Sequence, residues 1–167
     1  MTVNLQVNED VVLQPQLNIS ALEGLIPVAK KALEILDKTN HDVSIVIMTD
    51  EQITDLNASY RGVEGPTDVL SFAAEPPPPG IEIDDALYLG DLLLAYTYTL
   101  QRAINSQHHP ADEFGLLVVH GILHLCGYNH DSNASQQIMW QKQREILQQV
   151  NIFLDVPDYI HETDDPS

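Results

Sequence analysis

The sequence contains a single cysteine, Cys126, so no intrachain disulfide can form and an oxidising compartment is not indicated. It also lacks any apolar stretch that approaches membrane-spanning length. Its first ten residues show no basic start, no long apolar run and no cleavage site of the signal-peptide type. These absences predict a soluble, cytoplasmic protein with no membrane partner.

Positive charge is also scarce. Seven Lys and Arg residues oppose 25 acidic residues, which gives a formal net charge of −18. Because such a field repels phosphate groups at long range, composition alone favours a small-molecule or protein partner over a nucleic acid. Any binding to a polyanion must therefore depend on a local basic patch, a metal ion or a partner.

A chain of 167 residues lies in the single-domain range and can bury a sizeable core. No internal repeat or domain boundary is visible. We therefore expect one domain over residues 1–154, followed by an acidic, proline-containing tail over residues 155–167 that frays. Residues 75–80 read Glu-Pro-Pro-Pro-Pro-Gly, and this segment predicts an exposed loop because proline cannot pair in a sheet interior.

Apolar periodicity predicts an α+β fold. Val3, Leu5 and Val7 alternate with polar residues as in a half-buried strand. Residues 42–48 are rich in β-branched, apolar side chains, as in a buried strand. From Ser20, with Glu23 completing a capping box, apolar residues recur at helical spacing. The full prediction is a small mixed sheet of about four strands covered by about five helices. The strands fall at residues 2–7, 42–48, 68–74 and 86–95, and the helices at 20–36, 49–60, 96–105, 110–126 and 132–150.

The most specific pattern is His120-Gly-Ile-Leu-His124-Leu-Cys-Gly127-Tyr-Asn-His130. The first two histidines are four residues apart, so their imidazoles project from one face of the central helix. Gly127 offers the positive φ that ends a helix, which lets the chain return His130 toward the pair. Three converging imidazoles with an open fourth position are typical of a catalytic zinc site, and one Zn²⁺ per chain is expected. The alternative is a set of structural histidines; the other four, which lack this spacing, are interpreted as surface or loop residues: His41, His108, His109 and His161.

The same spacing occurs in the long zinc-protease motif, where the residue after the first histidine is a glutamate that serves as general base. Gly121 occupies that position here and has no side chain to accept a proton. A peptidase would therefore need a base from elsewhere, and Glu113, about two turns earlier on the same helix, is the candidate. Zinc chemistry directed at a phosphodiester does not require this glutamate, so the protease becomes the alternative.

The histidine block resembles the signature of the YbeY family, which are bacterial and organellar endoribonucleases of rRNA maturation. The resemblance runs from about residue 43 to 150, with its motifs in the expected order. Three further segments carry it: Asn57-x-x-Tyr60-Arg61-Gly62 followed by Pro66–Phe72, then Leu89-Gly90-Asp91, then Met139 with Glu145-Ile146-Leu147.

This resemblance implies that His120, His124 and His130 are the zinc ligands of a metzincin-like helix, with His120 and Arg61 as catalytic residues. A guanidinium can bind a phosphate through two hydrogen bonds and stabilise charge that develops at phosphorus. The simpler interpretation of Arg61 is a surface ion pair with a carboxylate such as Glu64.

Further positions have a functional and a structural interpretation. Thr67, Asp68 and Ser71 either shape the pocket wall or begin a strand, and Asp91 either belongs to the site or is a buried hydrogen-bond acceptor. The chain departs from the family at Asn129, where the family usually has Asp; Asp131 could take over its role. Cys126 follows His124 by two positions and so points away from the histidine face, which favours a small core residue over a fourth ligand.

The resulting hypothesis is a metal-dependent hydrolase: a single-strand-specific, zinc-dependent endoribonuclease. The resemblance implies action in small-subunit rRNA 3′ end maturation and ribosome quality control, with rRNA and the small ribosomal subunit and its proteins as partners and no role for DNA. A metallopeptidase-like hydrolase and a non-catalytic ribosome-assembly factor with a structural metal remain the alternatives. The acidic surface suits docking to basic ribosomal proteins.

Overall fold

The computed structural model describes residues 1–74, 79–80 and 87–154. The tail expected at 155–167 lies outside these residues, so the proposed division after residue 154 stays a prediction. Of the proline-rich segment, Pro79 and Gly80 are described, and they lie in an exposed turn. No helix of the described part is long and apolar enough to span a membrane.

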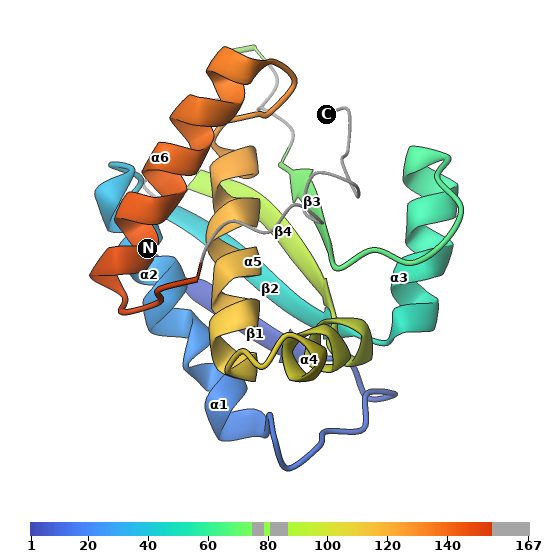
Figure 1. The fold of residues 1–167 in the computed structure, drawn as a ribbon. Helices are drawn as coiled ribbons and strands as arrows, with labels where there is room; N and C mark the ends of the chain where they lie inside the picture. Colours follow the sequence, from blue (N-terminus) through green and yellow to red (C-terminus); the bar gives the residue numbers. More distant parts are fainter. Residues whose placement is uncertain (75–78, 81–86, 155–167) are drawn as a thin grey trace.

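Four strands form one mixed sheet, as the periodicity predicted (Figure 1). Their order is β1-β2-β4-β3, with β1, β2 and β4 parallel and β3 antiparallel to β4. The register shifts once between β2 and β4, at Asp42 and Val43. The bounds are β1 Val3–Val7, β2 His41–Met48, β3 Val69–Ala73 and β4 Leu87–Ala95.

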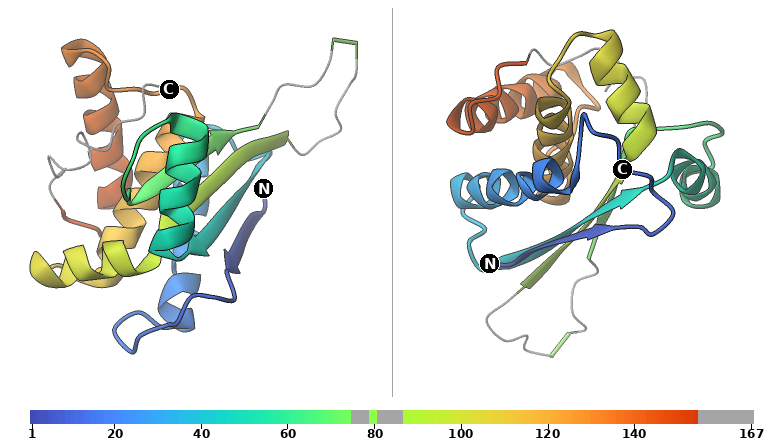
Figure 2. Two further views of the ribbon diagram at one scale, coloured as in Figure 1. Left: turned by 90° about the vertical axis from the view of Figure 1, so that its right-hand side faces the viewer. Right: turned by 90° about the horizontal axis from the view of Figure 1, so that it is seen from below.

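Side chains alternate between the two sheet faces, and each face has its own core. Ile45 and Ile47 of β2 join the large core shared with helices α2 and α5, whereas Met48 packs in a smaller cluster with Ile53 of α3. Figures 1 and 2 show α2, α5 and α6 gathered on one side of the sheet, with α3 set apart from them. The helical elements are α1 Ile19–Glu23, α2 Leu25–Ile35, α3 Asp50–Leu56, the π-helix η1 Asn57–Arg61, α4 Tyr96–Asn105, α5 Pro110–Leu125 and α6 Asn133–Gln149.

The prediction of one capped helix from Ser20 to Leu36 was wrong. The chain forms two helices that meet at Gly24, and the N-cap of the first is Asn18, whose side chain accepts a hydrogen bond from the Ala21 amide at 2.9 Å. Pro27 explains the break, because it has no N–H to donate to the carbonyl four residues earlier. The next helix, expected to start at residue 49, is capped by Thr49, which forms a reciprocal capping box with Gln52.

Two buried polar contacts connect the helices to the rest of the chain. The Tyr96 hydroxyl at the start of α4 donates to the Leu17 carbonyl at 2.6 Å and accepts from the Gln14 amide at 2.8 Å. Asp68, just before β3, is 1% exposed and pairs with Arg102 of α4 at 2.9 Å. These contacts connect α4 to the segment before α1 and to the start of β3.

Candidate metal centre

Helix α5 is the central helix that the sequence predicted. Pro110 occupies its first turn together with Asp112 and Glu113, where negative charge favours the helix dipole. Every residue from Glu113 to Leu123 is buried, because α2, α4, α6 and the sheet all pack around this helix. A helix enclosed in this way is a rigid support for the side chains it carries.

The C-terminal end of α5 turns the chain back toward the helix. The Gly127 amide donates to the His124 carbonyl and the Tyr128 amide to the Leu123 carbonyl, both at 3.0 Å. This pair of bonds is the Schellman motif, and Gly127 takes the required positive φ, 95°. The predicted turn is therefore present, and it returns the chain so that His130 faces the helix.

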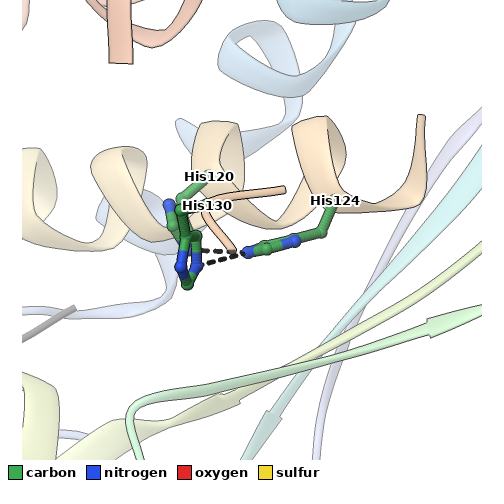
Figure 3. A group of neighbouring side chains, drawn as sticks. All are labelled: His120, His124 and His130. Carbon is green, nitrogen blue, oxygen red and sulfur yellow. Dashed lines mark hydrogen bonds between the residues drawn. The ribbon is translucent and has the colours of Figure 1, made fainter. Parts of the chain in front are cut away.

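The three histidines converge. The Nε2 atom of His124 lies 3.1 Å from Nε2 of His120 and 3.2 Å from Nε2 of His130 (Figure 3). Ligands at about 2.0–2.1 Å from a tetrahedral zinc ion lie roughly 3.3–3.4 Å apart, close to the distances observed. A single N–H on His124 can point to only one of its two neighbours, whereas three lone pairs can point to one cation. The donor set therefore fits a metal ion, and these histidines are positioned to bind one.

Two residues of α6 border the histidines, and the sequence interpretation missed both. The Oε1 atom of Gln143 lies 3.0 Å from Nδ1 of His120. The Trp140 ring centroid lies 5.7 Å from that of His120 and 5.4 Å from that of His130. A signal was present, because Gln143 interrupts the buried stripe of α6 with a polar side chain at a core position.

Gly121 faces the sheet at close range. An added Cβ would lie 2.6 Å from Cδ2 of Leu92 on β4 and 3.2 Å from Oγ of Ser71 on β3. The position that carries the glutamate in the protease motif therefore has no room for a side chain. Ser71 thus lies beside the histidine helix, and its expected role in a pocket wall stays a prediction.

Glu113, the candidate alternative base, pairs with His108. Its carboxylate is fully buried and lies 2.5 Å from Nδ1 of His108. Glu113 precedes His120 by seven positions, which places it about 10 Å away along the helix axis. The interpretation of His108 as a plain loop residue was incomplete, because this loop imidazole is half-buried against Glu113.

Arg61 is the last residue of η1 and is half-buried. The adjacent Tyr60 packs edge-on against Phe72 of β3, with ring centroids 5.6 Å apart. Because Ser71 and Phe72 point to opposite faces, η1 and α5 contact β3 from its two sides. The functional role of Arg61 stays a prediction.

The remaining candidates have structural partners. Thr67 is buried and its hydroxyl lies 3.4 Å from the Asp68 carboxylate, which also accepts from the Val69 amide. Asp91 is half-buried and accepts a hydrogen bond from the Tyr88 hydroxyl; burial first, and this bond second, raises the pKa of Tyr88. These contacts support the strand-start and sheet-supporting interpretations.

A pocket of about 250 Å³ lies at the turn that follows α5. Asn129, which directly precedes His130 in the sequence, is one of its lining residues. Cys126 is another, and burial raises the pKa of its thiol. The lining is Cys126, Gly127, Tyr128, Asn129, Ser135 and Ile138.

The fold and the converging histidines define an α+β protein with a three-imidazole metal-binding centre on a buried helix. A family model, endoribonuclease YbeY, matches residues 6–151. The endoribonuclease YbeY of Pelotomaculum thermopropionicum is 37% identical over 136 residues, covering 79% of this chain and 88% of the relative. That of Bacillus pumilus is 37% identical over 134 residues, covering 77% and 83%. A solution structure of TM1509 from Thermotoga maritima aligns over 99% of this chain and 98% of its own, at 21% identity and a TM-score of 0.49. The chain belongs to the endoribonuclease YbeY family.

Proposed function

We propose that this chain is a zinc-dependent endoribonuclease specific for single-stranded RNA. It acts in the cytoplasm on rRNA, with the small ribosomal subunit and its proteins as partners, in maturation of the 3′ end of small-subunit rRNA and in ribosome quality control. The observation that carries the proposal is the convergence of three Nε2 atoms: that of His124 lies 3.1 Å from that of His120 and 3.2 Å from that of His130. Membership of the family supports RNA as the substrate.

Zinc, when bound, supplies a Lewis acid that polarises a phosphoryl oxygen or lowers the pKa of a water molecule. The three imidazoles would hold the zinc ion. The contact between Nδ1 of His120 and Oε1 of Gln143 would fix the His120 ring. Trp140 covers the rings of His120 and His130 and limits water on that side. Arg61 is proposed to hold the scissile phosphate through paired hydrogen bonds.

The packing of Gly121 and the buried pairing of Glu113 both disfavour a peptidase. Neither residue can present a carboxylate at the histidines without a rearrangement of α5. This argument favours a reaction in which phosphate binding and charge stabilisation contribute more than a carboxylate base.

The test combines metal analysis with cleavage of a single-stranded RNA. We expect about one zinc per chain in the wild type, none in His124→Ala, and loss of cleavage in both His124→Ala and Arg61→Glu. Two exposed residues supply matched controls: His109→Ala removes an imidazole, and Arg144→Glu makes the same charge change on α6. Full activity in His124→Ala and Arg61→Glu would refute the mechanism.

Two outcomes would point to the alternatives. Peptide cleavage without RNA cleavage would identify a peptidase. Normal rRNA maturation in cells that carry only His124→Ala would identify an assembly factor whose metal is structural.

A further inference from the structure

Gln143 is a fully buried polar residue on α6 whose side chain faces the histidine site. Its Oε1 lies 3.0 Å from Nδ1 of His120, which is itself 3% exposed. Residues one turn away on the same stripe, Met139 and Ile146, belong to the apolar core. A polar side chain thus occupies a position where the helix otherwise carries apolar ones.

The other end of the same amide is unsatisfied. Among the described residues, no acceptor lies within hydrogen-bond distance of the buried Nε2 of Gln143. A buried donor without a partner costs stability, so an apolar side chain of equal volume would suit the core better. Core packing therefore does not explain a glutamine here, whereas the contact made by its Oε1 does.

That contact selects the tautomer of His120. With Oε1 as acceptor, Nδ1 of His120 carries the proton and donates it, which leaves the lone pair on Nε2. Nε2 is the atom that faces the other two imidazoles. A reversed amide would place the proton on Nε2 and block metal binding at that atom.

We infer that Gln143 is a positioning residue: it holds His120 in the tautomer and ring orientation that present Nε2 to the metal. The inference rests on the proposed function, because it requires that the triad binds a metal ion. Hydrogen bonds of this kind, from the second ring nitrogen of a ligating histidine, typically change metal affinity 10- to 100-fold.

The experiment measures zinc affinity by competition with a chromogenic chelator, for the purified full chain. Gln143→Met removes the acceptor at nearly constant volume, Gln143→Glu keeps an acceptor at the same place, and Gln141→Met is the control at an exposed position of the same helix. We expect a 10- to 100-fold loss of zinc affinity in Gln143→Met, affinity at or above the wild-type value in Gln143→Glu, and no change in Gln141→Met.

A second readout separates positioning from general loss of structure. Trp140 is the sole tryptophan and lies against two of the three histidines, so Co²⁺ bound there should quench its fluorescence. The Co²⁺ concentration at half-quenching should rise in Gln143→Met, while the far-ultraviolet circular dichroism of the metal-free protein stays that of the wild type.

The possible failures are distinguishable. A wild type that binds no zinc would overturn the proposed function and this inference together. One zinc per wild-type chain, with affinity in folded Gln143→Met within twofold of the wild type, would overturn the inference alone. Equal losses in Gln143→Met and Gln143→Glu would also overturn it, because the acceptor would then not be the cause.

Discussion

Replacing Gly121 by alanine tests how closely α5 approaches the sheet. Alanine favours a helix interior by about 1 kcal/mol over glycine, so an unobstructed site would be stabilised. Here the new Cβ would lie 2.6 Å from Cδ2 and 3.4 Å from Cδ1 of Leu92, which is fully buried on β4. Overpacking of a closed core costs about 1–3 kcal/mol. We therefore expect a net loss of roughly 0–2 kcal/mol in the free energy of unfolding.

Gly115, on the same helix, is the matched control. A Cβ there would lie 2.5 Å from Cδ1 of Ile152, and the next nearest atom is 3.9 Å away. Ile152 follows the last helix and presents only the end of a flexible side chain, which can move. Gly115→Ala should therefore cost about 1–2 kcal/mol less than Gly121→Ala, since both gain the same helix propensity.

The assay is urea unfolding of the metal-free protein, monitored by circular dichroism. Free energies of unfolding are compared between proteins that share the same m-value. The double variant Gly121→Ala/Leu92→Val should recover about 0.5–1.5 kcal/mol relative to the sum of the single changes, because valine lacks the clashing methyl groups. The reasoning fails if Gly121→Ala is more stable than the wild type by the full propensity gain. Gly121→Glu meets the same obstruction, so we expect a destabilised protein without peptidase activity.

Four further predictions concern two buried hydrogen-bonded pairs, the cysteine thiol and the net charge. Asp68→Asn should lower the free energy of unfolding by about 3 kcal/mol, because it breaks the buried pair with Arg102; Arg144→Gln, at an exposed position, should lower it by less than about 0.5 kcal/mol in the same urea titration. Tyr96→Phe should cost about 1–3 kcal/mol by the same method, since it leaves the Leu17 carbonyl without its hydroxyl donor; a cost near zero would contradict the buried bond. Cys126 should react with a disulfide reagent at pH 8 at least about tenfold more slowly in the native protein than in urea, because burial raises the pKa of its thiol; equal rates would show an open site. RNA cleavage at subsaturating substrate should accelerate as salt rises from about 0.01 to 0.1 M, over which the Debye length falls from about 30 to 10 Å; a steady decline would show that local basic contacts outweigh the net charge.

The sequence was sufficient for the histidine site because its determinants are local. Helical spacing places His120 and His124 on one face, and the turn at Gly127 returns His130. The strands were predictable for the same reason, since alternation marks residues 2–7 and β-branched, apolar residues mark 42–48.

Features that depend on two distant segments were not predictable in this way. Gln143 meets His120 across 23 residues, and only the packing of α6 on α5 brings them together. The contact of Gly121 with β3 and β4 likewise depends on the distance between a helix and a sheet. The split at Gly24 is different, because the sequence contains evidence for it. Pro27 indicates a break in the helix, but the apolar stripe continues across the break and favours a single helix.

The net charge of −18 describes the whole surface, whereas the reaction depends on the field at one end of α5. None of the six residues that line the pocket at that end carries a formal charge at neutral pH. A divalent cation held by His120, His124 and His130 would add positive charge at the same end of the helix as this uncharged pocket. Metal binding would therefore make the local potential more positive as well as supply a Lewis acid. In an acidic chain of this family, RNA affinity and metal occupancy should consequently rise and fall together.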